Sequence, residues 1–256
     1  MQIYQIEIEK KDTENQMISV TMLQALLSVI IEGSKGALRL RTEARSMVRG
    51  APPQWLTAAT TFSLAFKDNK LHIQSPNLLE AAPEKFEQSN DFSELKAERT
   101  SIDYFQDSLV AAINNDTESF YDKPLLEVFQ GFRHVFNQGA TKIHVLGEDG
   151  IEINPETLTI LKEAQANIPF PSPVKITGKL EDMKAYDRTF KLITSQDGEV
   201  IRGIAQPMAH KEVQLLLGKE VLVSGIAYYT TTRKVFRIEA EQISVIATEK
   251  VMPSTT

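Results

Sequence analysis

Apolar residues recur at every second position in some runs of this chain and at every third or fourth position in others, so both strands and amphipathic helices are expected. The alternation over Ile3 to Ile8 predicts an opening strand. From Met17 to Ile31 the spacing becomes that of a helix, which Gly33 and Gly36 are expected to bend or end. A second helix is expected from Ala37 to Val48.

Hairpins and further helices complete the pattern up to residue 168. Paired strand patterns flank two polar turns, Lys67-Asp68-Asn69 and Gly147-Glu148-Asp149-Gly150. One further helix is expected to begin at Pro53, and three more are expected at 78–86, 102–113 and 124–136. The last is expected to run from the N-cap Asn154 to about Ala166. This mixture predicts an α/β domain.

The clearest boundary in the chain is the segment from Pro169 to Pro173, which holds three prolines in five residues. Such a segment is extended and semi-rigid. We therefore expect an α/β domain at 1–168, a linker at 169–173, a second domain at 174–247 and a flexible tail at 248–256.

The second domain shows three strand patterns, a short helix and two more strand patterns. The strands are expected at 174–184, 189–194, 199–205, 219–229 and 235–246, with the helix at 210–217. This order, the passage from Leu217 to Gly225, and glycines at 178, 203 and 225 resemble the OB fold, a five-stranded Greek-key barrel. Other small Greek-key barrels stay open as alternatives. The fold class expected for the whole chain is α+β, a mixed α/β domain followed by an OB-like β-barrel.

Three short segments are also similar to those of an uncharacterised bacterial protein family. They are Pro53 to Thr60, Leu79 to Pro83 and Arg188 to Phe190. The resemblance implies no known activity.

Composition narrows the class of protein. The chain has 256 residues, of which 42% are hydrophobic and 24% charged, so it can bury substantial cores. A net charge of −6 argues against a surface that coats nucleic acid or anionic lipid as a whole. Without cysteine, thiolate catalysis and Cys-ligated metals are excluded. No apolar signal core opens the chain, and the stretch from Met22 to Ile31 is too short for a bilayer, so a cytoplasmic protein without membrane partners is expected.

No motif indicates a reaction. Glycine-rich phosphate loops and nucleophile elbows are absent from the sequence. The four histidines, His72, His134, His144 and His210, share no metal-ligand spacing. We therefore expect no cofactor and no metal, and favour a non-enzymatic protein over an enzyme with a site at the domain junction.

The first candidate binding cluster is a basic helix. Its members are Lys35, Arg39, Arg41, Arg45 and Arg49. In a helix, Arg41, Arg45 and Arg49 would align on one face. That face would either anchor nucleic acid or an acidic partner, or simply face solvent.

The second candidate cluster is on the barrel, where aromatic and basic residues are interleaved. Residues 172–247 contain 11 Lys and Arg against 9 Asp and Glu, a balance of +2, whereas residues 1–171 contain 16 against 24, a balance of −8. Tyr186 and Arg188 are expected in the loop between the first two strands, Tyr228, Tyr229, Arg233 and Lys234 around the loop between the last two, and Lys191, Arg202 and Arg237 on outward faces of strands. OB domains bind oligonucleotides through these regions.

Two kinds of function are expected from these clusters. The first is a binding protein whose OB-like domain engages single-stranded nucleic acid or a protein partner. The alternative is an interaction or regulatory subunit of a bacterial complex, antitoxin-like or part of a defence system. Its support is the apolar face from Leu125 to Phe136 and the basic helix, either of which exceeds what one core requires. The sequence leaves the oligomeric state open.

Overall fold

The computed structural model describes residues 1–12, 17–67, 70–87, 94–116, 121–146, 150–184, 188–205 and 208–246. The turn residues 68–69 and 147–149, Tyr186 and the tail 248–256 lie outside the described residues. The chain divides into two compact units, Met1–Ile168 with Thr230–Thr232, and Pro169–Tyr229 with Arg233–Thr256. The first is a mixed helix and sheet unit and the second a closed five-stranded barrel, which confirms the expected α+β class.

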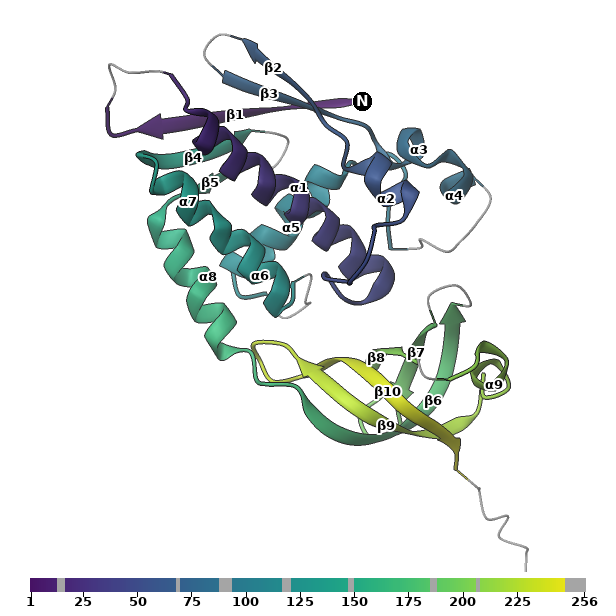
Figure 1. The fold of residues 1–256 in the computed structure, drawn as a ribbon. Coiled ribbons are helices and arrows are strands. Elements are labelled where there is room, and N and C mark those ends of the chain that lie inside the picture. The colour runs from purple at the N-terminus through teal and green to yellow at the C-terminus, as the bar shows by residue number, and fades with distance from the viewer. Residues whose placement is uncertain are drawn as a thin grey trace, which may run out of the picture. The chain divides into compact units, whose positions relative to one another are not determined.

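The first unit contains an antiparallel sheet with the strand order β2-β3-β1-β4-β5 (Figure 1). Its strands are β1 (Gln2–Lys10), β2 (Ser63–Lys67), β3 (Lys70–Ser75), β4 (Ala140–Leu146) and β5 (Ile151–Ile153). Its helical segments are α1 (Val20–Glu43), α2 (Gln54–Ala59), α3 (Leu78–Ala81), α4 (Pro83–Glu87), α5 (Ser101–Ile113), α6 (Lys123–Phe129), η1 (Gln130–Phe132), α7 (Arg133–Phe136) and α8 (Pro155–Asn167).

One face of this sheet is apolar and the helices cover it (Figure 1). Tyr4 and Ile6 on β1 lie opposite Ile73 and Leu71 on β3, and all four side chains are buried. The intervening residues, such as Gln5, point to the other face and stay partly exposed. The alternation in the sequence therefore predicts these strands correctly, because period-two patterning is what a half-buried strand requires.

Helix α1 continues through Gly33 and Gly36 to Glu43, so the prediction that it could end at these glycines is wrong. A Cβ on Gly33 would stand 2.6 Å from Cδ2 of Phe105, and one on Gly36 would stand 2.8 Å from Cδ1 of Leu125. The glycines thus let α5 and α6 approach α1 closely. Their role is to allow close helix packing, and they do not end the helix.

The apolar segment from Leu125 to Phe136 forms α6, η1 and α7 rather than one helix, and it lies in the core. Phe129 and Phe132 are 0% exposed and pack edge-on against Phe105 at centroid distances of 5.5 and 6.4 Å. Because the core of the first unit already covers this face, it offers no docking surface. The expected alternative of an interaction subunit loses that part of its support.

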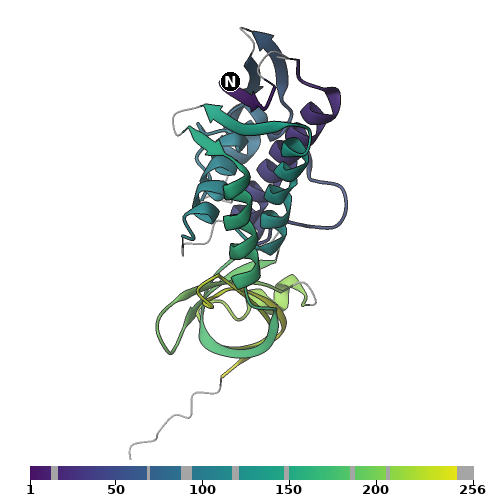
Figure 2. The same cartoon turned by 90° about the vertical axis from the view of Figure 1, so that its left-hand side faces the viewer.

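The second unit is a closed barrel, which Figure 2 shows as a ring of strands. Its strand order is β10-β8-β7-β6-β9. Its elements are β6 (Ser172–Lys184), β7 (Thr189–Thr194), β8 (Val200–Ile204), α9 (His210–Gln214), β9 (Glu220–Tyr229) and β10 (Val235–Val245). All neighbours pair antiparallel except β10 and β8, which are parallel. Because β6 begins at Ser172, the last two residues expected in the linker belong to a strand.

Tight packing explains two of the barrel glycines. A Cβ on Gly203 of β8 would stand 1.9 Å from Cζ of Phe190 on β7, and one on Gly225 of β9 would stand 2.1 Å from the Glu239 carbonyl oxygen on β10. The ring of Phe190 fills the barrel interior beside Leu192 and Ile238. The glycines therefore permit the strong coiling that closes five strands around one core.

Candidate functional site

The barrel places three cationic side chains in one row across three adjacent strands. Lys191 on β7 lies opposite Arg202 on β8, and Arg202 lies opposite Arg237 on β10. The residues beside them in sequence, including Leu192 and Ile238, belong to the barrel core, so these three point outward. Lys191 and Arg202 are partly exposed on this face, whereas Arg237 is buried.

The row continues onto β9, where Tyr228 lies opposite Arg237. The Cζ atom of Arg237 stands 3.8 Å from the centroid of the Tyr228 ring and 5.6 Å from that of Phe236. A guanidinium nitrogen of Arg237 also lies 3.3 Å from Oε1 of Glu239. Arg237 is only 5% exposed, so it supports the Tyr228 ring rather than presenting its charge directly to a ligand.

Burial raises the pKa of the Tyr228 phenol, and the Glu239 carboxylate raises it further. The ring therefore stays neutral near pH 7. A neutral, half-buried ring held by a cation on one side is suited to stacking against a planar ligand.

Two further arginines lie in loops at the ends of these strands, and both have a left-handed backbone. Arg188, just before β7, has φ 56°, and Arg233, between β9 and β10, has φ 67°. Both are exposed. Residues other than glycine adopt this conformation at a cost of roughly 1–2 kcal/mol, and such residues cluster at functional sites.

Other members of the expected barrel cluster have local partners. Lys234 forms an ion pair with Glu199, which raises the pKa of the lysine ammonium. The Tyr229 hydroxyl lies 2.6 Å from Oγ of Ser172 in a hydrogen bond. Tyr186 lies outside the described residues, so the structure does not place it.

The basic helix does not exist as a charged face. Helix α1 ends at Glu43, and Ala44 follows in the left-handed conformation, so Arg45 and Arg49 are not part of it. Arg39 is 8% exposed, donates to the Val48 carbonyl at 3.3 Å and lies 3.6 Å from Glu43, while Lys35 pairs with Glu32 at 2.8 Å. The expected alignment of Arg41, Arg45 and Arg49 is wrong because the helix stops before two of them.

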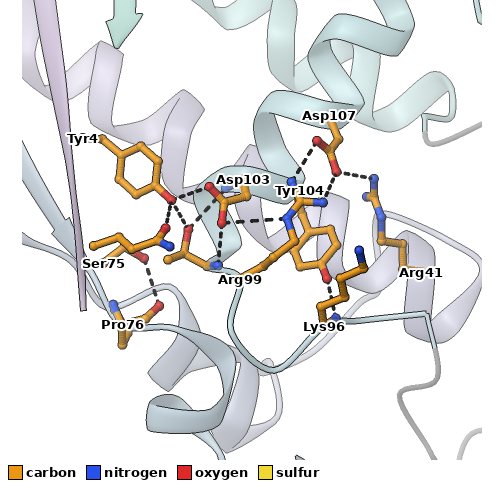
Figure 3. Close-up of polar contacts among 11 residues, drawn as sticks. Tyr4, Arg41, Ser75, Pro76, Lys96, Arg99, Asp103, Tyr104 and Asp107 are labelled. Atoms are coloured by element: carbon orange, nitrogen blue, oxygen red, sulfur yellow. Dashed lines mark hydrogen bonds and ion pairs between the residues drawn. The ribbon is translucent and has the colours of Figure 1, made fainter. Parts of the chain in front are cut away.

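Arg41 instead belongs to a polar network inside the first unit (Figure 3). One of its guanidinium nitrogens donates to the Ala37 carbonyl at 3.0 Å and to Oγ of Ser108 at 3.1 Å. The Cζ atoms of Arg41 and Arg99 stand 4.9 and 4.6 Å from the centroid of the Tyr104 ring. With 5% of its surface exposed, Arg41 is a structural residue of this unit.

The same network joins β1 to the start of α5. The Tyr4 hydroxyl donates to Asp103, whose other carboxylate oxygen accepts from the Thr100 backbone N–H at 2.8 Å (Figure 3). Thr100 caps α5 in return, and this Thr-x-x-Asp capping box is a signal that the sequence carries. Arg99 then donates twice to Asp107, at 2.7 and 2.9 Å.

The electrostatics of this network favour a structural role over catalysis. Burial strongly raises the pKa of Tyr4, and its hydrogen bond to Asp103 adds to the effect. Burial also raises the pKa of Tyr104, and the Asp107 hydrogen bond raises that of Arg99. Phenols held protonated and a guanidinium held charged donate hydrogen bonds but do not serve as bases near neutral pH.

Metal and membrane signals are not found in the described part of the chain. Its histidine, aspartate and glutamate side chains form no group of three that would hold a metal ion. His144 lies 3.0 Å from Glu9 and 3.9 Å from Glu152 on the open face of the sheet. No helix among the described residues is long and apolar enough to cross a bilayer.

Comparison with known proteins yields no match among family models, curated proteins or solved structures. The resemblance to a bacterial family therefore stays a prediction.

Proposed function

We propose that the C-terminal barrel binds single-stranded nucleic acid across the outer faces of β7, β8 and β10. Lys191 and Arg202, which are in register on β7 and β8, carry this proposal, and the buried Arg237 continues the row as the support of the Tyr228 ring. Neighbouring strands lie about 4.8 Å apart, so these two cations, together with the exposed loop residues Arg188 and Arg233, form a short track for a phosphate backbone.

The topology supports assignment of the barrel to the OB type. Three strands, the short helix α9 and two strands follow one another along the chain, and the parallel pairing of β8 with β10 closes the barrel. OB barrels bind oligonucleotides on the second and third strands and on the loops after the first and fourth strands. Here those strands are β7 and β8, and those loops carry Arg188 and Arg233.

Groups that contact bases accompany the cations. Tyr228 ends the row, and Ile193 lies opposite Val200, two residues from Lys191 and Arg202 and therefore on the same outer face. Val200 is 58% exposed. An aromatic ring and apolar side chains beside cations favour stacking of bases, each contributing roughly 1–3 kcal/mol, over recognition of a phosphate group alone.

Charge also favours a local site. The barrel carries +2 on a chain of −6, so a nucleic acid would approach this unit rather than the acidic residues 1–171. Contacts to about three to five phosphates would give a salt slope of roughly −2 to −3.5 on a logarithmic plot.

Fluorescence anisotropy with labelled single-stranded oligonucleotides at several salt concentrations tests the proposal. We expect wild-type affinity to fall with salt, and the double variant Lys191→Glu with Arg202→Glu to lose at least about tenfold at low salt. Lys211→Glu is the matched control, since Lys211 is an exposed lysine on α9 and away from the row. Absence of binding by the wild type at low salt, or equal loss in the control, would overturn the proposal.

A protein ligand of the same unit is the second candidate. Leu215 and Leu217, directly after α9, are 72% and 46% exposed, and Leu216 between them packs against the barrel core. Adjacent exposed leucines favour contact with a protein surface. Co-purification with a partner protein tests this candidate. We expect the double variant Leu215→Ser with Leu217→Ser to lose the partner, and the Lys191 and Arg202 double variant to retain it.

A further inference from the structure

The outer strand of the N-terminal sheet has an edge that no described residue covers. Strand β2 pairs with β3 on one side, and all five of its residues from Ser63 to Lys67 are exposed. The backbone N–H and C=O groups on the outer side of such a strand are a template for another strand. This edge belongs to the first unit, whereas the proposed nucleic-acid interface belongs to the second.

The edge also carries apolar side chains on the helix-covered side of the sheet. Leu64 lies opposite Ile73, and Phe66 lies opposite Leu71. Ile73 and Leu71 are 0% exposed, whereas Leu64 and Phe66 are 44% and 58% exposed. The apolar layer of the sheet therefore continues past the helices onto β2, where nothing among the described residues covers it.

We propose that β2 pairs antiparallel with β2 of a second copy of this chain, around a two-fold axis at Ala65. In that register Leu64 of one copy lies opposite Phe66 of the other, twice. An aliphatic residue opposite an aromatic one stabilises strand pairs. The axis is perpendicular to the sheet, so the helices of both copies stay on one side and the apolar side chains form one strip.

The symmetry of the β2 sequence selects a second copy as the occupant. The pattern Ser-Leu-Ala-Phe-Lys is polar, apolar, small, apolar, polar, and therefore matches itself when reversed. The cation Lys67 falls opposite the neutral Ser63 of the other copy, so no like charges face each other. The contact uses the β2 edge of each copy and is therefore closed. It joins the five-stranded sheets of the two copies into one continuous sheet.

The size of the contact sets its strength. Stable protein interfaces bury about 800 Å² on each partner, and one short strand pair covers less than that. We therefore expect a dimer with a dissociation constant on the order of 100 µM, visible by sedimentation over a range of concentrations.

Single-cysteine variants test the register directly, because the natural chain contains no cysteine. Directly opposite Cβ atoms in an antiparallel pair lie about 5 Å apart, close enough for a disulfide after small adjustments. Ala65→Cys is expected to form a disulfide-linked dimer under mild oxidation. Gln74→Cys, on the same open face but one strand in from the edge, is the control and is expected to stay monomeric.

Charge variants give a second, independent readout. Ala65→Lys and Ala65→Glu each place like charges opposite each other at the axis, so each protein alone is expected to be monomeric at all concentrations. Mixing the two is expected to restore the dimer. Gln74→Lys and Gln74→Glu are matched controls and are expected to dimerise as the wild type does. Circular dichroism confirms that each variant is folded.

A wild type that sediments as a monomer at concentrations near 1 mM, roughly ten times the expected dissociation constant, overturns the proposal. It is also overturned by equal cross-linking of Ala65→Cys and Gln74→Cys, or by failure of the charge mixture to associate. The expected combined result is a wild type that dimerises, and Ala65→Lys and Ala65→Glu variants that are monomeric but bind oligonucleotide as the wild type does.

Discussion

The guanidinium of Arg237 and the ring of Tyr228 are stacked across neighbouring strands of the barrel, with Cζ 3.8 Å from the ring centroid. The two residues lie directly opposite each other in the pairing of β10 with β9. The pair fixes one ring orientation at the end of the row formed by Lys191 and Arg202. In the proposed interface Arg237 is thus a positioning residue and Tyr228 a contact residue.

The first prediction separates the ring of Tyr228 from its hydroxyl. Tyr228→Phe is expected to keep oligonucleotide affinity within about twofold, whereas Tyr228→Leu is expected to lose about 5- to 160-fold, the equivalent of the roughly 1–3 kcal/mol of one stacked base. Anisotropy titrations at fixed salt measure both. Equal affinity of the two variants would mean that no base stacks on this ring.

Arg237→Met extends this test to the positioning residue. It keeps an apolar stem under the ring but removes the charge, so we expect weaker binding with little change in the salt slope, because Arg237 is buried and neutralises no phosphate. Arg202→Met, at the partly exposed position in register with Arg237, is expected to lower the slope of log affinity against log salt concentration by about 0.7. A slope lowered equally by both would contradict the positioning role.

The second prediction concerns the left-handed arginines. Arg188→Gly and Arg233→Gly relieve the backbone, so each is expected to be roughly 1 kcal/mol more stable than the corresponding alanine variant. Both substitutions remove the charge, so Gly and Ala variants are expected to bind oligonucleotide equally weakly. Urea unfolding measures the first effect and anisotropy the second.

Lys191 supplies the control for this comparison. It lies within strand β7, where glycine is the less stable choice, so Lys191→Gly is expected to be about 0.5–1 kcal/mol less stable than Lys191→Ala. If Arg188→Gly and Arg233→Gly are also less stable than the corresponding alanine variants, these loops change conformation readily.

The strands were predictable because their signal is local. The alternation from Thr189 to Thr194 and the turn before Val200 identify β7 and β8 to within a residue, and the row of outward cations follows from that alternation. The burial of Arg237 was not predictable in this way. It depends on the register of β10 against β9, which includes a bulge between Val235 and Arg237, and no local pattern encodes that register.

The helical segments were less predictable, because the features that decide them are not local. The glycines in α1 look like helix ends in the sequence, but their meaning depends on Phe105 and Leu125, which are distant in the chain. Arg41 looks like part of an exposed charged face, yet it lies against Tyr104 and Ser108. In both cases a tertiary contact overrides what a helical pattern alone predicts.

The third prediction tests the packing role of Gly33. Helix propensity alone would make Gly33→Ala more stable by about 1 kcal/mol. The added methyl group would instead meet the Phe105 ring at 2.6 Å, and that ring is fixed between Phe129 and Phe132, so a net destabilisation of about 1–3 kcal/mol is expected. Ser28→Ala, at an exposed position of the same helix, is the control and is expected to be neutral or slightly stabilising. A stabilised Gly33→Ala would contradict the close approach of α1 and α5.

The fourth prediction uses the raised pKa of Tyr4. In the unfolded chain this phenol titrates near 10.0, and in the folded protein burial and Asp103 raise its pKa above that value. Above pH 10 the folded state therefore retains a proton that the unfolded state loses. The contribution of Tyr4 to the free energy of unfolding is therefore constant below pH 10. Above pH 10 it falls by at most about 1.4 kcal/mol per pH unit.

Tyr4→Phe should accordingly have two effects of opposite sign. At pH 7 it is expected to lower the free energy of unfolding by roughly 1.5–3 kcal/mol, because a hydrogen bond to a carboxylate is lost. Above pH 10 the gap between wild type and variant is expected to narrow, because the variant has no phenol at this position to titrate. Asp103→Asn is the control, since it also weakens the fold at pH 7 but keeps the burial that is the largest cause of the Tyr4 shift, and so keeps most of the alkaline loss. Urea unfolding from pH 7 to 11 measures these changes, and a constant gap between wild type and Tyr4→Phe would show that Tyr4 titrates alike in the folded and unfolded states.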